Sequence, residues 1–371
     1  MPTILHTEAS LGLGGQELRI VAESRWLRDH GWGALIACQP ESRLFAEART
    51  AGVDAVAVPM RNAVDLGALL ALRRLMKAFA VDLVHTHSST DSWSGALAAK
   101  SLGLPVVRSR HVSIAIRSAL VYRLADRIVT SGEAVRAIVV GAGIAPERVV
   151  AIAPGVDTAR FHPAVSGKTV RDELRLGAGE PLVGLVANIR GSKGHNVFLD
   201  GAREILRQAP FTRFLIVGDG VGYDEVRRRV SDLGLAEHVT MTGFRRDIPE
   251  VMAALDVLVL PSIRSEATSQ VIPQALAVGT PVVATTVGGS PELVRDGETG
   301  RLVPPEDPPA LARAVLEILR DPERARAMGR AGQAAISAGL TLDASMARTS
   351  AVYRDLLAGR GRPLLRARRR R

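Results

Sequence analysis

Residues 182–220 have the sequence LVGLVANIRGSKGHNVFLDGAREILRQAPFTRFLIVGDG. This stretch opens and closes with short apolar runs, 182–189 and 214–220, which are typical of buried strands. The sequence between them is compatible with a helix. Two strands joined by a helix in this way form a parallel β-α-β unit.

The same alternation of apolar runs and helical segments extends along the chain. Earlier strand candidates are 3–7, 34–38, 53–59, 82–87, 105–110, 127–131 and 149–154. Later candidates are 238–243, 257–262, 281–288 and 300–305. We therefore predict an α/β protein with two Rossmann-like domains, each a doubly wound parallel sheet covered by helices on both faces.

The strand pattern loosens between Pro154 and Pro181, and we place the connection between the two domains there. The predicted N-terminal domain is 1–165, and the predicted C-terminal domain is 166–340. Each domain is long enough to enclose a core of its own.

Three helical segments follow the last strand candidate. We expect those at about 308–320 and 322–338 to close the second domain, and one at about 342–358 to complete the first. An Arg-rich tail, 359–371, ends the chain. Residues 360–371 contain seven Arg and no acid, and without them the net charge falls from +10 to +3. The tail predicts contact with an anionic membrane surface, or alternatively a solvated segment; without stacking aromatic residues, nucleic acid is not expected.

Composition places the protein among ordinary globular chains, with 47% apolar and 23% charged residues in 371. A single cysteine, Cys38, excludes an internal disulfide, and no Cys/His spacing predicts structural zinc. No secretory leader or long uninterrupted apolar stretch is recognisable. We predict a cytoplasmic protein.

Ligands of open parallel sheets bind where strands end and helices begin. After the first strand, residues 8–17 (EASLGLGGQE) place Gly12, Gly14 and Gly15 where their backbone amides could approach a phosphate. A dinucleotide fingerprint would need glycine in place of Glu17, so an NAD site is disfavoured. The alternative is a tight turn that only allows close helix packing.

Two cations follow the strand at 182–189. Arg190 and Lys193 lie on one short loop, NIRGSKGH, and together they suit a diphosphate. The alternative is a solvated pair on the surface.

An acid and several polar groups lie close together within residues 261–303. Pro273 prevents its helix from beginning much before Gln270. Glu266 and the amides of Ala267, Thr268 and Ser269 then lie in the loop before the helix. Gln274 falls in the first turn, so this loop and the Gln274 side chain could face one ligand.

At this point the chain resembles the retaining glycosyltransferases of family 4, which have the GT-B fold. The resemblance spans nearly the whole chain, and its motifs are specific in combination. They are GLGGQE (12–17), VHTHSS (84–89), SRH ending at His111, APGVDTARFHP (153–163), RGSKGH (190–195), VGDG (217–220) and the segment 265–303.

The resemblance implies that the C-terminal domain binds a nucleotide sugar, that the N-terminal domain holds the acceptor, and that no metal or other cofactor is needed. Arg190 and Lys193 resemble the cations that hold the donor diphosphate and stabilise its charge as the glycosidic bond breaks. Gly14 and Gly15 look like amides that meet the same diphosphate. His111 resembles a histidine beside the donor sugar; the alternative is a histidine satisfied at a strand end.

Glu266 is similar to the first acid of the family's E-x7-E motif, which with the amides of Ala267, Thr268 and Ser269 holds the transferred sugar. Gln274 stands in place of the second acid, which usually binds the ribose. The nucleotide base is implied to contact backbone near Gly243 and Phe244. We expect Lys193 and Glu266 to lie in exposed loops, where truncation would leave the fold intact.

His85 and His87 share one face of a predicted strand, with Asp91 beyond, and this pattern is compatible with a metal site. No third ligand lies at a suitable spacing, so we predict a cleft-lining role for them instead. The resemblance implies retention of configuration, with the departing phosphate oxygen as the base. A spaced carboxylate pair of the glycosidase type is not evident.

The predicted function is transfer of a sugar from a nucleotide-diphosphate sugar to a glycan or lipid-linked acceptor. The resemblance places this reaction in lipopolysaccharide or cell-surface polysaccharide assembly, in the cytoplasm or at the inner face of the membrane. A nucleotide-sugar epimerase and a nucleotide-binding protein without transfer activity are the alternatives. A dehydrogenase is the remotest alternative.

Overall fold

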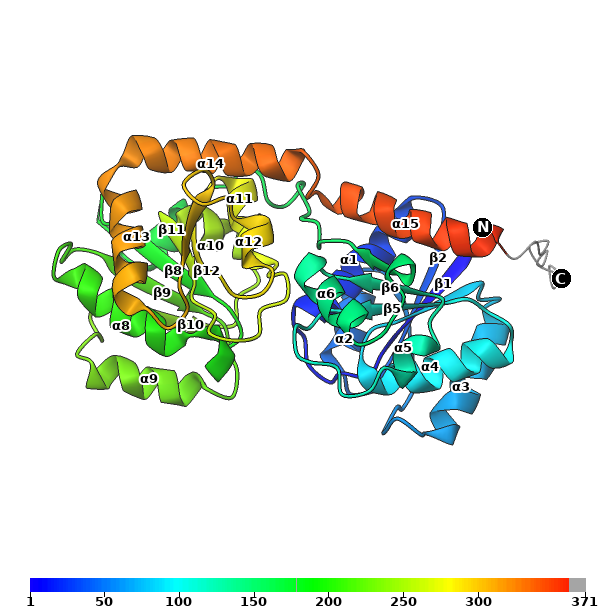
Figure 1. Ribbon diagram of the computed structural model, residues 1–371. Helices are drawn as coiled ribbons and strands as arrows, with labels where there is room; N and C mark the ends of the chain where they lie inside the picture. Colours follow the sequence, from blue (N-terminus) through cyan, green and yellow to red (C-terminus); the bar gives the residue numbers. More distant parts are fainter. Residues whose placement is uncertain (178, 360–371) are drawn as a thin grey trace. The chain divides into compact units, whose positions relative to one another are not determined.

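The computed structural model describes residues 1–177 and 179–359 (Figure 1). The chain divides into two compact units. Unit 1 comprises Met1–Pro154 together with the described residues from Asp343 to Gly359, and unit 2 comprises Gly155–Leu342.

Unit 2 begins earlier than the sequence predicts, at Gly155 instead of 166. Val156 forms a parallel bridge with Thr341, and its carbonyl accepts the amide N–H of Leu342 at 2.8 Å. These contacts tie the segment after the seventh strand to the far end of unit 2. Residues this far apart in the sequence leave no local pattern that would predict their contact, so the boundary could not be placed at Gly155 from the sequence.

The sheet of unit 1 has seven parallel strands in the order β3-β2-β1-β4-β5-β6-β7. The strands are β1 (Thr3–Glu8), β2 (Gly33–Cys38), β3 (Asp54–Ala57), β4 (Leu83–Thr86), β5 (Val106–Arg110), β6 (Arg127–Thr130) and β7 (Val149–Ala151). All seven were predicted from the sequence. The strand order reverses between β1 and β4, which makes their carboxyl ends the topological switch point.

Helices cover both faces of this sheet (Figure 1). They are α1 (Gly15–Asp29), α2 (Arg43–Thr50), α3 (Leu66–Ala78), α4 (Ser89–Ser101), α5 (Leu120–Arg123), α6 (Glu133–Gly141), the short η1 (Pro146–Arg148) and α15 (Leu342–Ala358). Ile36 of β2 packs with Ile20 of α1, whereas its neighbour Leu35 packs with Leu72 of α3. Successive residues of one strand therefore supply two different cores.

Helix α15 returns to unit 1 as the sequence predicts. Trp26 Nε1 donates to Asp343 Oδ1 at 2.6 Å, and Ser345 Oγ donates to the Ala153 carbonyl at 3.0 Å. The fully buried Tyr353 lies against the sheet. Of the predicted tail, 359–371, residues 360–371 lie outside the described residues.

Unit 2 has a six-stranded parallel sheet in the order β10-β9-β8-β11-β12-β13. Its strands are β8 (Leu182–Val186), β9 (Arg213–Val217), β10 (Val239–Gly243), β11 (Val257–Leu260), β12 (Val282–Thr285) and β13 (Gly300–Val303). These six strands were also predicted. The switch point lies between β8 and β11.

The helices of unit 2 cover both faces of its sheet. They are α7 (Lys168–Glu173), the short η2 (Gly191–Lys193), α8 (His195–Leu206), α9 (Tyr223–Asp232), α10 (Ile248–Ala254), α11 (Val271–Val278), α12 (Ser290–Leu293), α13 (Pro308–Arg320) and α14 (Pro322–Ser337). In Figure 1, α8, α9 and α13 lie on one side of the sheet, and α10, α11 and α12 on the other. No helix within the described ranges is long and apolar enough to span a membrane.

The core of unit 2 explains why its strands are almost wholly apolar. Val183 and Leu185 of β8 join the core under α8 and α13, whereas Leu182 and Val186 join the core under α10 and α11. A strand buried on both faces needs apolar residues at every position. The predicted fold class, two Rossmann-like parallel-sheet domains, is confirmed.

Candidate functional site

The site of unit 2 is built from the two loops that leave its switch point. One loop follows β8 and leads through η2 into α8, and the other follows β11 and leads into α11. The Ile263 amide N–H of the second loop donates to the Ser192 carbonyl of the first at 3.0 Å. The two loops are therefore held together by their backbones.

Gly194 allows this close approach. It adopts the left-handed conformation with φ +73°, and a Cβ at this position would overlap the carbonyl oxygen of Pro261. Only glycine meets both requirements. The glycine between Lys193 and His195 thus sets the distance between the loop after β8 and the loop after β11.

Lys193 and Glu266 meet across these loops. Lys193 Nζ lies 2.6 Å from Glu266 Oε2, and Ser262 Oγ donates to the same oxygen at 2.6 Å. The side chains are 12% and 6% exposed, respectively. Our expectation that both lie in exposed loops is therefore wrong, because strand order, which the local sequence does not encode, packs one loop against the other.

Glu266 Oε1 makes no hydrogen bond to any described residue, since both contacts of the carboxylate use Oε2. Carboxylate oxygens can each accept two hydrogen bonds. The pair therefore orients a carboxylate whose second oxygen can accept hydroxyl groups of a ligand.

The loop after Glu266 packs against the glycine pair that follows β12. Gly289 donates its amide N–H to the Ala267 carbonyl at 2.7 Å. Gly288 has φ +59°, and a Cβ there would overlap the Glu266 carbonyl oxygen. The GG sequence in TTVGGSPE thus supports the backbone of the predicted sugar-binding loop.

Thr268 and Ser269 are buried in this loop. The Thr268 hydroxyl has no hydrogen-bond partner among the described residues. A buried hydroxyl without a partner is costly, which makes it a candidate ligand contact. Ser269 lies directly before Gln270, which occupies the N-cap position of helix α11.

Helix α11 begins at Val271, as Pro273 predicts. Gln274 is in its first turn and is partly exposed, so its amide is accessible to a ligand. Arg190 precedes η2 and is exposed; its carbonyl accepts the Lys193 amide N–H at 3.0 Å. The structure therefore brings the side chains of Lys193 and Glu266 into contact, whereas no hydrogen bond or ion pair joins the side chain of Arg190 or Gln274 to that pair.

The predicted base-contacting segment follows β10. Gly243 has φ +71°, and Phe244 is 44% exposed. The Arg245 guanidinium holds the segment in place by donating hydrogen bonds to the carboxylates of Glu173 and Asp247 at 2.6 to 2.9 Å. These hydrogen bonds lower the pKa of both carboxyls and raise the pKa of Arg245. The exposed ring and the fixed backbone are consistent with a binding role, which stays a prediction.

A second group of polar residues lies at the switch point of unit 1. The Gly14 amide N–H, predicted to meet a diphosphate, donates to Glu17 Oε2 at 2.7 Å. Glu17 thus caps the amino end of helix α1. An acid three residues after the N-cap residue is a local capping pattern, so this contact could have been predicted from the sequence. Gly15 is the first residue of α1. The phosphate role of both glycines stays a prediction.

Glu8, at the end of β1, is a buried carboxyl that the sequence analysis did not single out. Burial, followed by repulsion from Asp91, raises its pKa to about 8. Its oxygens accept hydrogen bonds from the Ser10 amide, at 2.8 Å, and from the Gln16 side chain. The fully buried Asp91 itself accepts from Thr7 Oγ1 at 2.7 Å. Buried acids of this kind cannot be distinguished from exposed ones by residue type.

Four histidines gather on the same edge. His6 of β1 and His85 of β4 are direct neighbours in the strand register. His87 follows β4, and His111 follows β5. One ligand atom from each of His6, His85 and His87 lies within 4.8 Å of the others. The statement that no third ligand accompanies His85 and His87 is therefore wrong, because sheet pairing brings His6 from 79 residues away.

Burial dominates the electrostatics of these rings. It lowers the pKa of His6 to about 4 and the pKa values of His85, His87 and His111 well below the usual value. The cation of Arg19 lowers the pKa of the last three further. The rings are therefore neutral at physiological pH.

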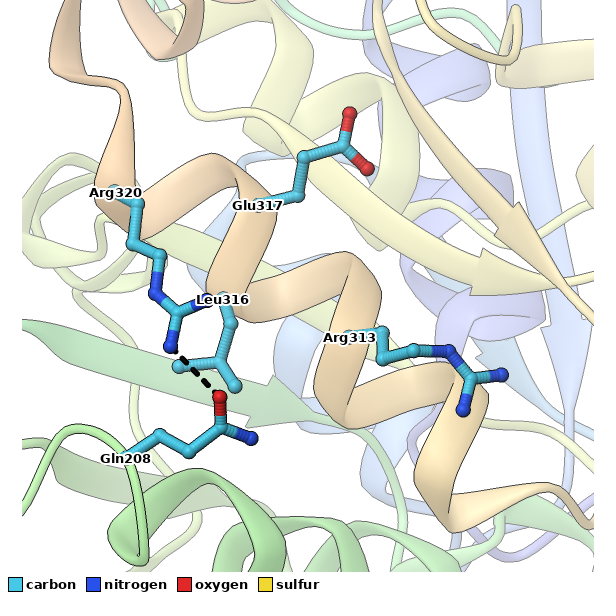
Figure 2. A pocket seen from close by; sticks show the side chains of 5 residues that line it. All are labelled: Gln208, Arg313, Leu316, Glu317 and Arg320. Carbon is cyan, nitrogen blue, oxygen red and sulfur yellow. Dashed lines mark hydrogen bonds between the residues drawn. The ribbon is translucent and has the colours of Figure 1, made fainter.

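A surface hollow lies away from both groups of residues. It is lined by Gln208, Leu316 and three charged side chains of α13, and Arg320 donates to Gln208 Oε1 at 2.7 Å (Figure 2). Gln208 follows the carboxyl end of α8, whereas Lys193 precedes its amino end. The hollow is thus at the edge of unit 2 opposite the strand carboxyl ends.

Two Rossmann-like units in one chain, with polar groups at both switch points, define the GT-B class of fold. The profile of glycosyl transferases group 1 matches residues 180–321, and that of glycosyltransferase family 4 matches residues 13–160. The chain belongs to this family of group 1 glycosyltransferases.

Its relatives include a GDP-mannose-dependent phosphatidylinositol monomannoside mannosyltransferase of Mycolicibacterium smegmatis, 39% identical over 48% of this chain and 49% of the relative. A D-inositol 3-phosphate glycosyltransferase of Catenulispora acidiphila is 32% identical over 76% of this chain and 74% of its own. The chain matches about half the length of the mycobacterial relative.

Solved structures share the fold. Anabaena HepE in complex with UDP has a TM-score of 0.84 and 23% identity, over 95% of this chain and all of its own. Sucrose-phosphate synthase of Thermosynechococcus elongatus has a TM-score of 0.82 and 23% identity, over 97% of this chain and all of its own.

Proposed function

We propose that this chain is a retaining, metal-independent glycosyltransferase that moves a sugar from a nucleotide-diphosphate sugar to a glycan or lipid-linked acceptor. The observation that carries the proposal is the buried Lys193–Glu266 pair at the switch point of unit 2. It combines a cation for a diphosphate with an oriented carboxylate for sugar hydroxyls.

In this proposal Lys193 and Arg190 stabilise the charge that develops on the diphosphate as the glycosidic bond breaks. Glu266 Oε1, together with the Ala267–Ser269 loop, binds hydroxyl groups of the transferred sugar. A hydrogen bond to a charged group contributes about 1.5–3 kcal/mol. The acceptor hydroxyl attacks the anomeric carbon on the face that the diphosphate leaves, and the departing phosphate oxygen accepts the hydroxyl proton. Because the new bond forms on the face of the broken one, the product keeps the anomeric configuration.

The names of the relatives support an inositol-containing acceptor, and the solved neighbour in complex with UDP supports a uridine nucleotide as one donor class. We place the reaction in lipopolysaccharide or cell-surface polysaccharide assembly, in the cytoplasm. The Arg-rich tail is proposed to hold the enzyme at an anionic inner leaflet, with each basic residue contributing about 1 kcal/mol.

The first experiment is calorimetric titration of the full chain with UDP, GDP and ADP. We expect one nucleotide to bind selectively, and Lys193→Gln to weaken its binding at least tenfold. Lys168→Gln is the matched control, because Lys168 belongs to an exposed ion pair of the same unit. Equal binding by wild type and Lys193→Gln would contradict the assigned site.

A second experiment follows the sugar. The corresponding nucleotide sugar is incubated with myo-inositol 3-phosphate or phosphatidylinositol vesicles, and the product's anomeric coupling is measured by NMR. Retention in a glycosylated product supports the proposal. Conversion of the donor sugar without any acceptor would instead indicate an epimerase, and binding without either reaction would indicate a nucleotide-binding protein.

A further inference from the structure

Three imidazole rings in unit 1 form a hydrogen-bonded chain. His6 Nδ1 lies 2.9 Å from His87 Nε2, and His87 Nδ1 lies 3.3 Å from His111 Nε2. The His6 and His87 rings are stacked, and so are the His87 and His111 rings. The chain thus runs from the buried β1 to the partly exposed His111 in the loop after β5.

His85 adjoins this chain without being a link in it. Its Nδ1 is 2.6 Å from the Tyr353 hydroxyl, and its Nε2 is 2.7 Å from the Ser109 hydroxyl. Both ring nitrogens are therefore occupied. A metal ion held by His6, His85 and His87 would have to break these bonds and the direct His6–His87 contact, so the arrangement favours hydrogen bonding over metal coordination.

The inner end of the chain determines the direction of its hydrogen bonds. Each contact between two neutral rings joins one N–H to one bare nitrogen. His6 Nε2 is buried and has no hydrogen-bond partner among the described residues. If His6 Nε2 carried the proton, a buried N–H would be left without an acceptor, which is more costly than an unused lone pair.

The proton of His6 therefore lies on Nδ1 and is donated to His87 Nε2. The remaining proton of His87 is then on Nδ1 and is donated to His111 Nε2. His111, whose Nε2 is the acceptor, must carry its own proton on Nδ1. No described residue hydrogen-bonds to His111 Nδ1, which leaves that N–H as a donor for a ligand.

We propose that His6 and His87 are positioning residues that hold His111 in the single tautomer with an Nδ1–H donor. The acceptor of this donor is a hydroxyl or phosphate oxygen of a ligand bound at the switch point of unit 1, and that this ligand is a reactant of sugar transfer rests on the proposed function. In the proposed reaction the leaving phosphate takes the proton, so the three imidazole rings transfer none. Their role is to fix the orientation of one hydrogen-bond donor, the His111 Nδ1–H.

The tautomer can be measured directly by NMR of the full-length protein with ¹⁵N-labelled histidine, because protonated and bare ring nitrogens have well-separated shifts. We expect His111 to show a protonated Nδ1 and a bare Nε2. His87→Asn retains a side-chain N–H donor for His111 Nε2 and should preserve this signature. His87→Leu cannot donate and should give a mixture of tautomers, while the exposed His30→Asn is the control.

Activity gives an independent readout. We expect His87→Leu to lower kcat about three- to tenfold, which corresponds to one neutral hydrogen bond, with His87→Asn restoring most of the loss. A His111 with its proton on Nε2, or with mixed tautomers in the wild type, would overturn the proposal. So would stoichiometric zinc in the purified protein that shifts the histidine signals on chelation. If the protein transfers no sugar, the NMR signature still determines the tautomer of His111. Failure of the proposed function can therefore be distinguished from failure of the tautomer proposal.

Discussion

Lys193 Nζ lies 2.6 Å from Glu266 Oε2, and the two residues come from loops on opposite sides of a topological switch point. Both side chains are largely removed from water. A buried pair of charges costs desolvation energy that only good geometry offsets. The contact is therefore better explained by binding than by stability, since a cation and a carboxylate are held ready at the edge where α/β sheets bind ligands.

Removing one member of this pair should destabilise the protein more than removing both. Lys193→Met leaves the Glu266 carboxylate buried without its cation, and we expect a loss of about 3–5 kcal/mol in the free energy of unfolding. The double variant with Glu266→Gln should lose less. Urea denaturation measures this, with the exposed Lys168→Met expected to cost no more than about 1 kcal/mol. Additive losses would contradict the coupling.

Gln274 offers a test of donor binding at the same site. Gln274→Glu places a charge in the first turn of α11, where the helix dipole stabilises an anion. A charged acceptor binds a hydroxyl more strongly than a neutral amide, so we expect the Kd for the nucleotide to fall about fivefold. Calorimetry measures the change, and Gln274→Ala should weaken binding. Weaker binding by Gln274→Glu would show that the site requires the amide.

The sequence was sufficient to predict the strands and the helices that cover them, because buried parallel strands have continuous apolar runs. It also placed Lys193 and Glu266 in the loops that form the site. It could not predict their contact, which depends on β8 and β11 being neighbours. The same reason explains why His6 was not connected with His85, whereas the Glu17 cap of Gly14 is local and could have been recognised.

Two glycines with similar backbone conformations allow steric overlap to be separated from backbone strain. Gly288→Ala adds a methyl group that overlaps the Glu266 carbonyl, whereas at Gly297, with φ +76°, nothing lies within 4 Å. The left-handed backbone should cost both Gly288→Ala and Gly297→Ala about 1–2 kcal/mol in the free energy of unfolding. We expect Gly288→Ala to lower the Tm more than Gly297→Ala does and to weaken nucleotide binding, because the added methyl group displaces the Glu266 loop. Equal effects of the two variants would contradict the close packing of these loops.

Buried histidines make acid conditions destabilising. Burial lowers the pKa of five residues, His6, His85, His87, His111 and His195. In the unfolded chain each would titrate near 6.5. Their contribution to stability is therefore complete above pH 6.5 and is lost as the pH falls toward the folded-state values, about 4 for His6 and His195. Each extra proton bound by the unfolded chain changes the free energy by about 1.4 kcal/mol per pH unit.

Glu8 has the opposite effect on stability, because its carboxyl favours folding at low pH and not at high pH. Its pKa is raised from 4.5 to about 8, so its contribution is complete below pH 4.5 and is lost as the pH rises toward 8. At pH 6.5 about half of the five histidines are still protonated in the unfolded chain, so together they outweigh this one carboxyl until only about one of the five remains protonated, at about pH 7. We therefore expect the free energy of unfolding to be greatest at about pH 7, measured by urea denaturation from pH 5 to 8.5. Glu8→Gln should abolish the decline on the alkaline side and steepen the rise on the acid side, because Glu8 no longer opposes the histidines there. An unaltered alkaline decline would show that another group causes it.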